Sequence, residues 1–231
     1  MNSRAINLKR SPVFVRAAPF LAFLVVTLLQ NNSGQGGRYW FYLVKTVIVG
    51  WMLCTFRRAI SEMRWKFSGE AILVGIGVFI MWVGLLPLLE VLGINTSWAV
   101  RKPSAAPLWN PFTFFQSVSL GWFFVIVRIV GSTLVVPPME EVFYRSFVYR
   151  YVTKQDFETV PVGQFYWTPF IVTSVMFGFG HHEWLAGILC GFAYQGLVCR
   201  KKRLGDAIAA HAITNFLLGI WVVYYNAWHF W

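Results

Sequence analysis

The adjacent carboxylates Glu140 and Glu141 closely follow a long apolar run, and no other two acidic residues are neighbours in this sequence. On a helix, Glu141 and Arg145 are four residues apart on one face and can form an ion pair. Glu140 points about 100° away from Glu141 and is left without that partner. The pattern indicates one structural carboxylate and one carboxylate available as a base. The local pattern alone favours the alternative, an interfacial helix with solvated charges.

All four histidines lie in the last quarter of the chain, and His181 follows the end of an apolar run. Phe177 lies four residues earlier, on the same helical face, and Gly178 and Gly180 permit close packing between helices. A histidine at the end of a membrane span can serve as a general base, a metal ligand or an interfacial anchor. The local sequence leaves all three open.

His211 and Asn215 are four residues apart within the last apolar run, and therefore share a helical face. Two hydrogen-bonding groups at this spacing can donate to an oxyanion or hold a water. They can also form hydrogen bonds between helices that only stabilise packing. The three groups together supply a carboxylate, two histidines and an amide, which can activate water and stabilise the oxyanion of peptide hydrolysis.

The composition determines what kind of protein must position these groups. Hydrophobic residues make up 57% of the 231 residues and charged residues 13%, whereas a soluble domain carries roughly 25% charged residues. A soluble enzyme, a disordered tail and a nucleic-acid-binding domain are poor fits. The net charge of +11 comes from basic residues that flank apolar runs, as at the cytoplasmic face of a membrane. We therefore predict contact with membrane lipid and no nucleic acid partner.

Seven apolar runs have nearly the length of about 20 residues that crosses the hydrocarbon core. They cover residues 13–29, 39–56, 71–92, 114–136, 166–180, 184–198 and 207–225. The sequence predicts an all-α, polytopic integral membrane protein with about seven or eight transmembrane or membrane-embedded helices, in a single membrane domain spanning 1–231. Pro137 and Pro138 break or kink the fourth run, and the segment Met139–Val152 provides the possible eighth helix.

Basic residues predict the orientation of the chain, because they favour the cytoplasmic side. Around the start of the first run lie Arg4, Lys9, Arg10 and Arg16. After the second run lie Arg57, Arg58, Arg64 and Lys66, and after the sixth run lie Arg200, Lys201, Lys202 and Arg203. This distribution predicts a cytoplasmic N-terminus. Arg101 and Lys102, in a proline-rich loop, would then lie outside.

The ordered motifs resemble those of the CPBP family, the CAAX-processing and bacteriocin-processing intramembrane proteases. That family has a Glu-Glu-x-x-x-Arg motif, then Phe-x-x-x-His, then His-x-x-x-Asn or Asp, and all three match here without departure. The resemblance covers the motif-bearing core, residues 136–225. The stretches 183–187 and 210–215 also resemble the subgroup found with bacterial exosortase systems.

The resemblance implies hydrolysis of a peptide bond within the membrane, in a membrane-associated peptide or protein substrate. Glu140 would be the base and His181 would help to activate water. His211 and Asn215 would bind the oxyanion from the opposite wall of the site, and Arg145 would position the glutamate pair. A metal-free mechanism is favoured, while a zinc site made of two histidines and a glutamate stays open.

The competing hypothesis is a non-catalytic membrane protein: a transporter, or an immunity or scaffold protein that keeps the motifs as a polar packing network. The two hypotheses differ in geometry. A protease needs Glu140, His181, His211 and Asn215 to converge in one cavity, whereas scattered positions would argue for the alternative.

Overall fold

The computed structural model describes residues 11–64, 66–100 and 108–231, and the regular structure within these ranges is helical throughout. The first half of the chain forms α1 (Pro12–Asn31), α2 (Gly34–Phe56), α3 (Gly69–Val91) and the short α4 (Pro111–Phe115). Next comes one continuous helical rod, made of α5 (Val118–Val130), the π-helical η2 (Gly131–Val135), α6 (Val136–Glu141), the π-helical η3 (Val142–Val148) and α7 (Tyr149–Thr153). The 3₁₀ turn η4 (Phe157–Thr159), α8 (Trp167–Phe179), α9 (Trp184–Lys201), α10 (Gly205–Tyr225) and the 3₁₀ turn η5 (Trp228–Phe230) complete the chain.

The prediction of an all-α, polytopic membrane protein is confirmed. Five helical stretches within the described ranges are long and apolar enough to cross a membrane, namely α1, α2, α3, the rod and α10, while α8 is apolar but shorter. One detail of the prediction is wrong, because the segment Met139–Val152 is not a separate helix but continues the rod. A second difference is that the fourth run divides into two helices, α4 and α5. The helix α5 begins at Val118, and the side chain of Ser117 caps it. Arg4, Lys9, Arg10, Arg101 and Lys102 lie outside the described residues.

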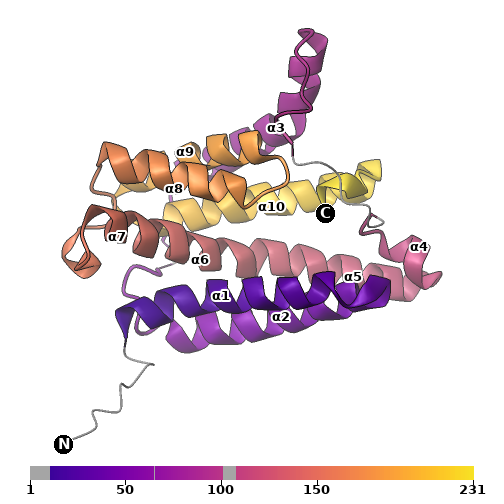
Figure 1. Ribbon diagram of the computed structural model, residues 1–231, viewed down its shortest axis with the longest axis horizontal. Helices are drawn as coiled ribbons and strands as arrows, with labels where there is room; N and C mark the ends of the chain where they lie inside the picture. Colours follow the sequence, from indigo (N-terminus) through magenta and orange to yellow (C-terminus); the bar gives the residue numbers. More distant parts are fainter. Residues whose placement is uncertain (1–10, 65, 101–107) are drawn as a thin grey trace, which may run out of the picture.

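The long helices run side by side (Figure 1). The rod lies between the pair α1 and α2 on one side and the group α8, α9 and α10 on the other. The last part of α3 projects out of this bundle, whereas its first part packs closely against α10.

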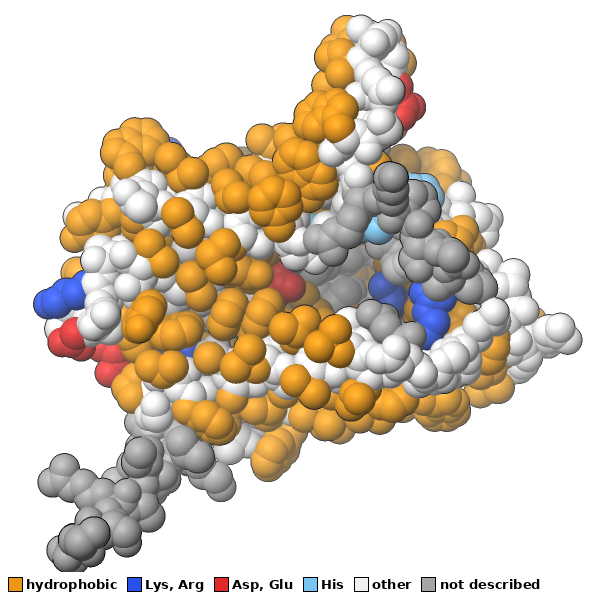
Figure 2. Space-filling model, viewed as in Figure 1, with side chains coloured by type: hydrophobic (Ala, Val, Ile, Leu, Met, Phe, Trp, Pro, Cys, Tyr) orange, Lys and Arg blue, Asp and Glu red, His pale blue; other side chains and the backbone are white. Residues whose placement is uncertain are grey.

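Hydrophobic side chains cover much of the face between the two ends of the bundle (Figure 2). Trp51, Leu73 and Trp167 are each about two-thirds exposed or more. In water, apolar surface on this scale would be a liability. It is the surface expected of helices that contact lipid, because lipid tails solvate it.

Pro137 and Pro138 do not end the helix, contrary to one of the two outcomes that the sequence left open. They lie in the first turn of α6, directly after the π-helical turn η2. A proline inside a helix removes an N–H donor and its ring presses on the preceding turn. The wider turn of a π-helix gives the ring room and leaves carbonyl groups of that turn free for other donors.

An ion cluster joins several elements at the end of the bundle where α1 begins. Glu62, in the loop between α2 and α3, accepts hydrogen bonds from Arg16 of α1 at 2.9 Å and from Arg150 of α7 at 2.6 Å. Ser146 donates to the same carboxylate. Burial raises the pKa of Glu62, but the hydrogen bonds from Arg16 and Ser146 outweigh it and lower the pKa to about 2. The cluster therefore stays charged at neutral pH.

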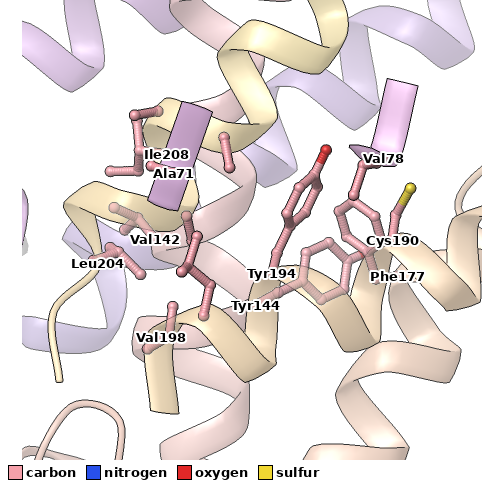
Figure 3. Packing of buried hydrophobic residues seen from close by; sticks show 14 of the residues in the cluster. Ala71, Val78, Val142, Tyr144, Phe177, Cys190, Tyr194, Val198, Leu204 and Ile208 are labelled. Atoms are coloured by element: carbon pink, nitrogen blue, oxygen red, sulfur yellow. The ribbon is translucent and has the colours of Figure 1, made fainter. Parts of the chain in front are cut away.

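The core next to the site is built mainly from α3, η3, α8, α9 and α10. Tyr144, Phe177 and Tyr194 lie side by side within it, close to Cys190 and Val78 (Figure 3). The predicted close packing at Gly178 is confirmed. A Cβ atom at this position would lie 2.5 Å from the backbone nitrogen of Ile188 in α9.

Replacing Gly178 by alanine should lower stability by about 1–3 kcal/mol, because backbone atoms of α9 cannot yield to the added methyl group. The measurement is thermal or denaturant unfolding of the purified protein in detergent. Gly196→Ala is the matched control on α9, since a Cβ there meets nothing within 4 Å. It should leave stability unchanged or slightly raised. Equal losses in both variants would contradict the close approach.

Candidate active site

One cavity of about 440 Å³ is lined by Glu140 of α6, His181 from the loop between α8 and α9, and His211 and Asn215 of α10. Figure 2 shows a hollow on the face in view, with Lys, Arg and His side chains along it. The four side chains that a protease needs together therefore converge. They are not scattered over separate surfaces, as the non-catalytic hypothesis predicts for them.

The short length of α8 explains how His181 reaches the level of His211. The 13 residues of α8 rise about 20 Å, which is less than the roughly 30 Å thickness of the hydrocarbon core. The helix therefore ends inside the bundle, and the following loop carries His181 to the cavity. His211 needs only the first two turns of α10 to reach the same place.

Glu141 is fully buried between two cationic or hydrogen-bonding partners. Its Oε2 lies 3.3 Å from Nε of Arg145, so the predicted ion pair is confirmed. Its Oε1 lies 3.0 Å from Nδ1 of His211. The Arg145 guanidinium also lies 4.2 Å from the centre of the Phe177 ring and donates a long hydrogen bond of 3.5 Å to the carbonyl of Gly191. Glu141 thereby connects the rod to α8, α9 and α10.

Glu140 has a different environment from its neighbour. Its side chain is 14% exposed, it lines the cavity, and its Oε2 has no hydrogen-bond partner among the described residues. The nearest histidine nitrogen in the described contacts is Nε2 of His211, at 4.0 Å. The expected division of the two carboxylates is found: Glu141 is held closely by Arg145 and His211, whereas Glu140 has only the more distant contact with His211.

The expectation that His211 faces Glu140 from the opposite wall is wrong. His211 lies beside Glu140, because its other ring nitrogen is held by the adjacent Glu141. Arg145 likewise forms its ion pair with Glu141 alone of the two carboxylates. Glu140 and Glu141, neighbours on α6, thus both lie against the imidazole of His211. The spacing of residues along α10 does not predict this arrangement.

His181 is oriented by the backbone of its own motif. Its Nδ1 lies 2.8 Å from the carbonyl oxygen of Phe177, and because a carbonyl only accepts, Nδ1 carries the hydrogen. Nε2 is then left as the acceptor. Burial lowers the pKa of His181, which lies in the loop after α8, so the ring is neutral near pH 7. A neutral ring with a free acceptor nitrogen can hold a water.

Asn215 binds the π-helical turn of the rod. Its Nδ2 donates to the carbonyl oxygen of Ser132 at 2.8 Å, which is one of the groups that η2 frees from the ordinary helical pattern. An amide has two N–H donors, so the second hydrogen can still serve a ligand in the cavity.

Two residues that the motifs did not indicate support His211. The Tyr194 ring stacks on the imidazole, with centres 5.0 Å apart and planes 19° apart. Its hydroxyl donates to Thr214, which in turn donates to the carbonyl of Gly75 in α3. Thr214 lies inside the His-x-x-x-Asn motif, so its position gave a signal. Tyr194 gave none, because an aromatic residue in an apolar helix is ordinary core.

Within the described residues, no three His, Cys, Asp or Glu side chains are grouped so as to hold a metal ion. One nitrogen of His211 is already bonded to Glu141. The lining also includes Lys45 and Arg128, which the motifs did not indicate. The metal-free reading stays a prediction.

Residues 122–217 match the family model described as Rce1-like, type II CAAX prenyl endopeptidase Rce1-like. The matched range contains all six predicted site residues: Glu140, Glu141, Arg145, His181, His211 and Asn215. The resemblance read from the motifs is thus confirmed for this part of the chain, while the exosortase-associated subgroup stays a prediction. The comparisons with curated proteins and with solved structures gave no match.

Arg145→Ala should destabilise the protein by about 3–5 kcal/mol, because it leaves the buried carboxylate of Glu141 without its cation. Unfolding in detergent and the yield of folded protein measure this. Arg200→Ala is the matched control, since Arg200 pairs with Glu70 at the surface and is 73% exposed. An exposed pair contributes at most about 1 kcal/mol. Similar stability of the two variants would contradict a structural role for the Arg145 pair.

Proposed function

We propose that the protein hydrolyses peptide bonds within the membrane, with Glu140 as the general base, and the match of residues 122–217 to the Rce1-like family model of CAAX prenyl endopeptidases supports this. The observation that carries the proposal is the environment of Glu140. One of its oxygens has no partner, and it faces a cavity that also contains His181, His211 and Asn215. A base must have this freedom, because a carboxylate already held in an ion pair is a poor proton acceptor.

In the proposed first step, water binds between Glu140 and Nε2 of His181. Glu140 takes one proton of the water while its oxygen attacks the carbonyl carbon of the substrate. The C–O bond forms, and the electron pair of the C=O bond moves to the carbonyl oxygen. The remaining hydrogen of Asn215 Nδ2 donates to this oxyanion.

In the second step the oxyanion collapses and the C–N bond breaks. Glu140 returns its proton to the departing nitrogen, so that the products are one carboxylic acid and one amine. Glu141 does not exchange protons in this scheme. It accepts the Nδ1 hydrogen of His211 and fixes the orientation of the ring, as a buried carboxylate does for a catalytic histidine in other hydrolases.

The substrate is a membrane-associated peptide or protein, which reaches the cavity from the lipid side or along the interface. We propose that the N-terminus of the chain is cytoplasmic. The loops after α2 and after α9 carry Arg57, Arg58, Arg64, Lys66, Lys202 and Arg203. They lie at the same end as the start of α1, since Arg16 bonds Glu62 and Gly205 lies against the backbone of Arg64. This end has the positive charge that favours the cytoplasm.

Glu140→Gln should abolish cleavage of a membrane peptide reconstituted with the protein, because glutamine keeps the size of the side chain but cannot take a proton. Asn215→Ala should lower turnover by about 10²–10³, the usual effect of losing one oxyanion donor. Glu90→Gln, at the exposed end of α3, is the matched control and should cleave normally. Near-normal cleavage by a folded Glu140→Gln protein would favour the non-catalytic alternative.

The metal-free scheme has its own test. Preincubation of the reconstituted protein with a strong zinc chelator, followed by removal of the chelator, should leave the rate of cleavage unchanged. Loss of activity that added zinc restores would show instead that a metal activates the water.

A further inference from the structure

A second pocket, of about 420 Å³, lies at the end of the bundle where α1 begins, on the left of Figure 1. It is formed by the loop between α2 and α3, the loop before α8, and the turn between α9 and α10, and we name it the loop pocket. Its charged lining residues are Glu62, Arg64, Lys66, Lys202 and Arg203. The described linings of this pocket and of the proposed catalytic cavity share no residue. Its volume lies in the range of about 300–1,000 Å³ that is typical of ligand sites.

The three loops are held against one another by close backbone contacts. A Cβ atom at Gly205, the first residue of α10, would lie 2.4 Å from the carbonyl oxygens of both Arg64 and Lys66. Gly163 approaches the end of α9 as closely, since its Cβ would lie 2.5 Å from the carbonyl oxygen of Val198. The walls of the loop pocket are therefore in place before a ligand arrives, which reduces the entropy that binding costs.

Three cations of the loop pocket have no acidic partner. The chain has nine acidic residues, and all of them lie in the described ranges. None forms an ion pair with Arg64, Lys66 or Lys202. Nε of Arg64 donates to the carbonyl of Ser61, and Nζ of Lys202 donates to that of Gly163. Both cations keep further N–H groups, and the side chain of Lys66 makes no hydrogen bond or ion pair within the described structure.

The other charges of the loop pocket are already compensated. Glu62 is the single acidic side chain in the described lining, and it is paired with both Arg16 and Arg150. Arg203 is likewise paired with Asp206. An anion that enters the loop pocket would therefore meet three cations that nothing else neutralises.

Exposed aromatic side chains indicate that the loop pocket lies at the level of the lipid headgroups. Trp167 begins α8 and is 71% exposed, and its neighbour Tyr166 is 42% exposed. Phe67 follows Lys66 directly and is about half exposed. Tryptophan and tyrosine are enriched at the interface between membrane and water. Basic pockets between helices at the cytoplasmic side are known to bind anionic headgroups.

We infer that the loop pocket binds the phosphate group of an anionic phospholipid, taken from the leaflet at this end of the bundle. This is the cytoplasmic leaflet in the proposed orientation. The guanidinium of Arg64 and the ammonium groups of Lys66 and Lys202 donate to the phosphate oxygens, and such charge-assisted hydrogen bonds are about twice as strong as neutral ones. The bound lipid stabilises the folded protein, because it binds that state alone.

A soluble phosphate ion has the same chemistry as the phosphate of a headgroup. The interfacial position of the loop pocket favours the lipid. The negative surface potential of the cytoplasmic leaflet is produced by its anionic lipids, so these are concentrated at the loop pocket while soluble anions are repelled from it.

The test follows thermal unfolding of the protein in neutral detergent as short-chain phospholipids are added. A salt concentration of about 0.15 M screens the diffuse charge of the surface. Dihexanoyl phosphatidylglycerol at about 100 times its Kd should raise Tm by about 5–10 °C. Dihexanoyl phosphatidylcholine should raise it much less, because its choline places a positive charge beside the cations. Inorganic phosphate should also have little effect.

Two pairs of substitutions separate the loop pocket from the general charge of this end. Lys66→Gln combined with Lys202→Gln should raise Kd for phosphatidylglycerol by about 10- to 100-fold, the effect of losing one charge-assisted hydrogen bond or more. Arg57→Gln combined with Arg58→Gln is the matched control, since it removes two exposed cations of the same loop that do not line the pocket. It should leave Kd unchanged.

Lys66→Gln alone guards against a loss of stability from the bond between Lys202 and Gly163. It should keep the Tm of the lipid-free protein and still raise Kd. Equal weakening by the two pairs, or an equal shift with phosphatidylglycerol and phosphatidylcholine, would overturn the inference. A shift with inorganic phosphate as large as that with phosphatidylglycerol would show a site for a soluble anion, and the lipid site would be wrong. Cleavage is not measured, so the result does not depend on the proposed proteolysis.

Discussion

The buried carboxylate of Glu141 is the interaction on which the arrangement of the site depends. It holds Arg145 on its own rod and His211 on α10, and Arg145 in turn packs on Phe177 of α8 and reaches the carbonyl of Gly191 in α9. Four helical elements thus meet at one negative charge. In lipid this matters more than it would in water, because apolar packing between helices has no hydrophobic driving force there. Since Glu141 takes up the local cations, Glu140 is left to face the cavity.

Neighbouring carboxylates with opposite roles require precise control of direction along the rod. The π-helical turns on either side of α6 provide it, since each changes the angle at which the following residues leave the helix axis. They also free backbone carbonyl groups, of which Ser132 receives Asn215 of α10. The two prolines therefore do not weaken the rod at this point, but belong to the local geometry that joins the proposed general base to the proposed oxyanion donor.

The helices and the contacts within one motif could be predicted from the sequence. The contacts between motifs could be predicted only in part. Apolar runs have the length that lipid demands, so their positions follow from composition, and the pair Glu141 and Arg145 follows from helical spacing. The convergence of His181 with His211 depends on the end of α8 after 13 residues. An apolar run followed by glycine does not predict where the helix ends. The place of His211 beside Glu140 depends on packing across helices. Lys45 and Arg128 were visible as charges within apolar runs, but periodicity does not say that both face one cavity.

The polar groups of this cavity differ in how much they contribute to the stability of the fold. The group that contributes least, Glu140, is the one with the proposed role in catalysis. Glu141, Arg145 and Asn215 bond to other elements, so removing them affects both the packing of helices and the shape of the site. The Oε2 of Glu140 accepts no hydrogen bond in the described structure and lies 4.0 Å from Nε2 of His211. A buried carboxylate with so few contacts is unfavourable to the folded state, and sites of this kind persist because their function requires them. At the other end of the cavity, Lys45 and Arg128 rest on hydroxyl and aromatic groups that hold a cation without neutralising it. The cavity thus combines a carboxylate at one end with basic side chains at the other, in a poorly hydrated setting.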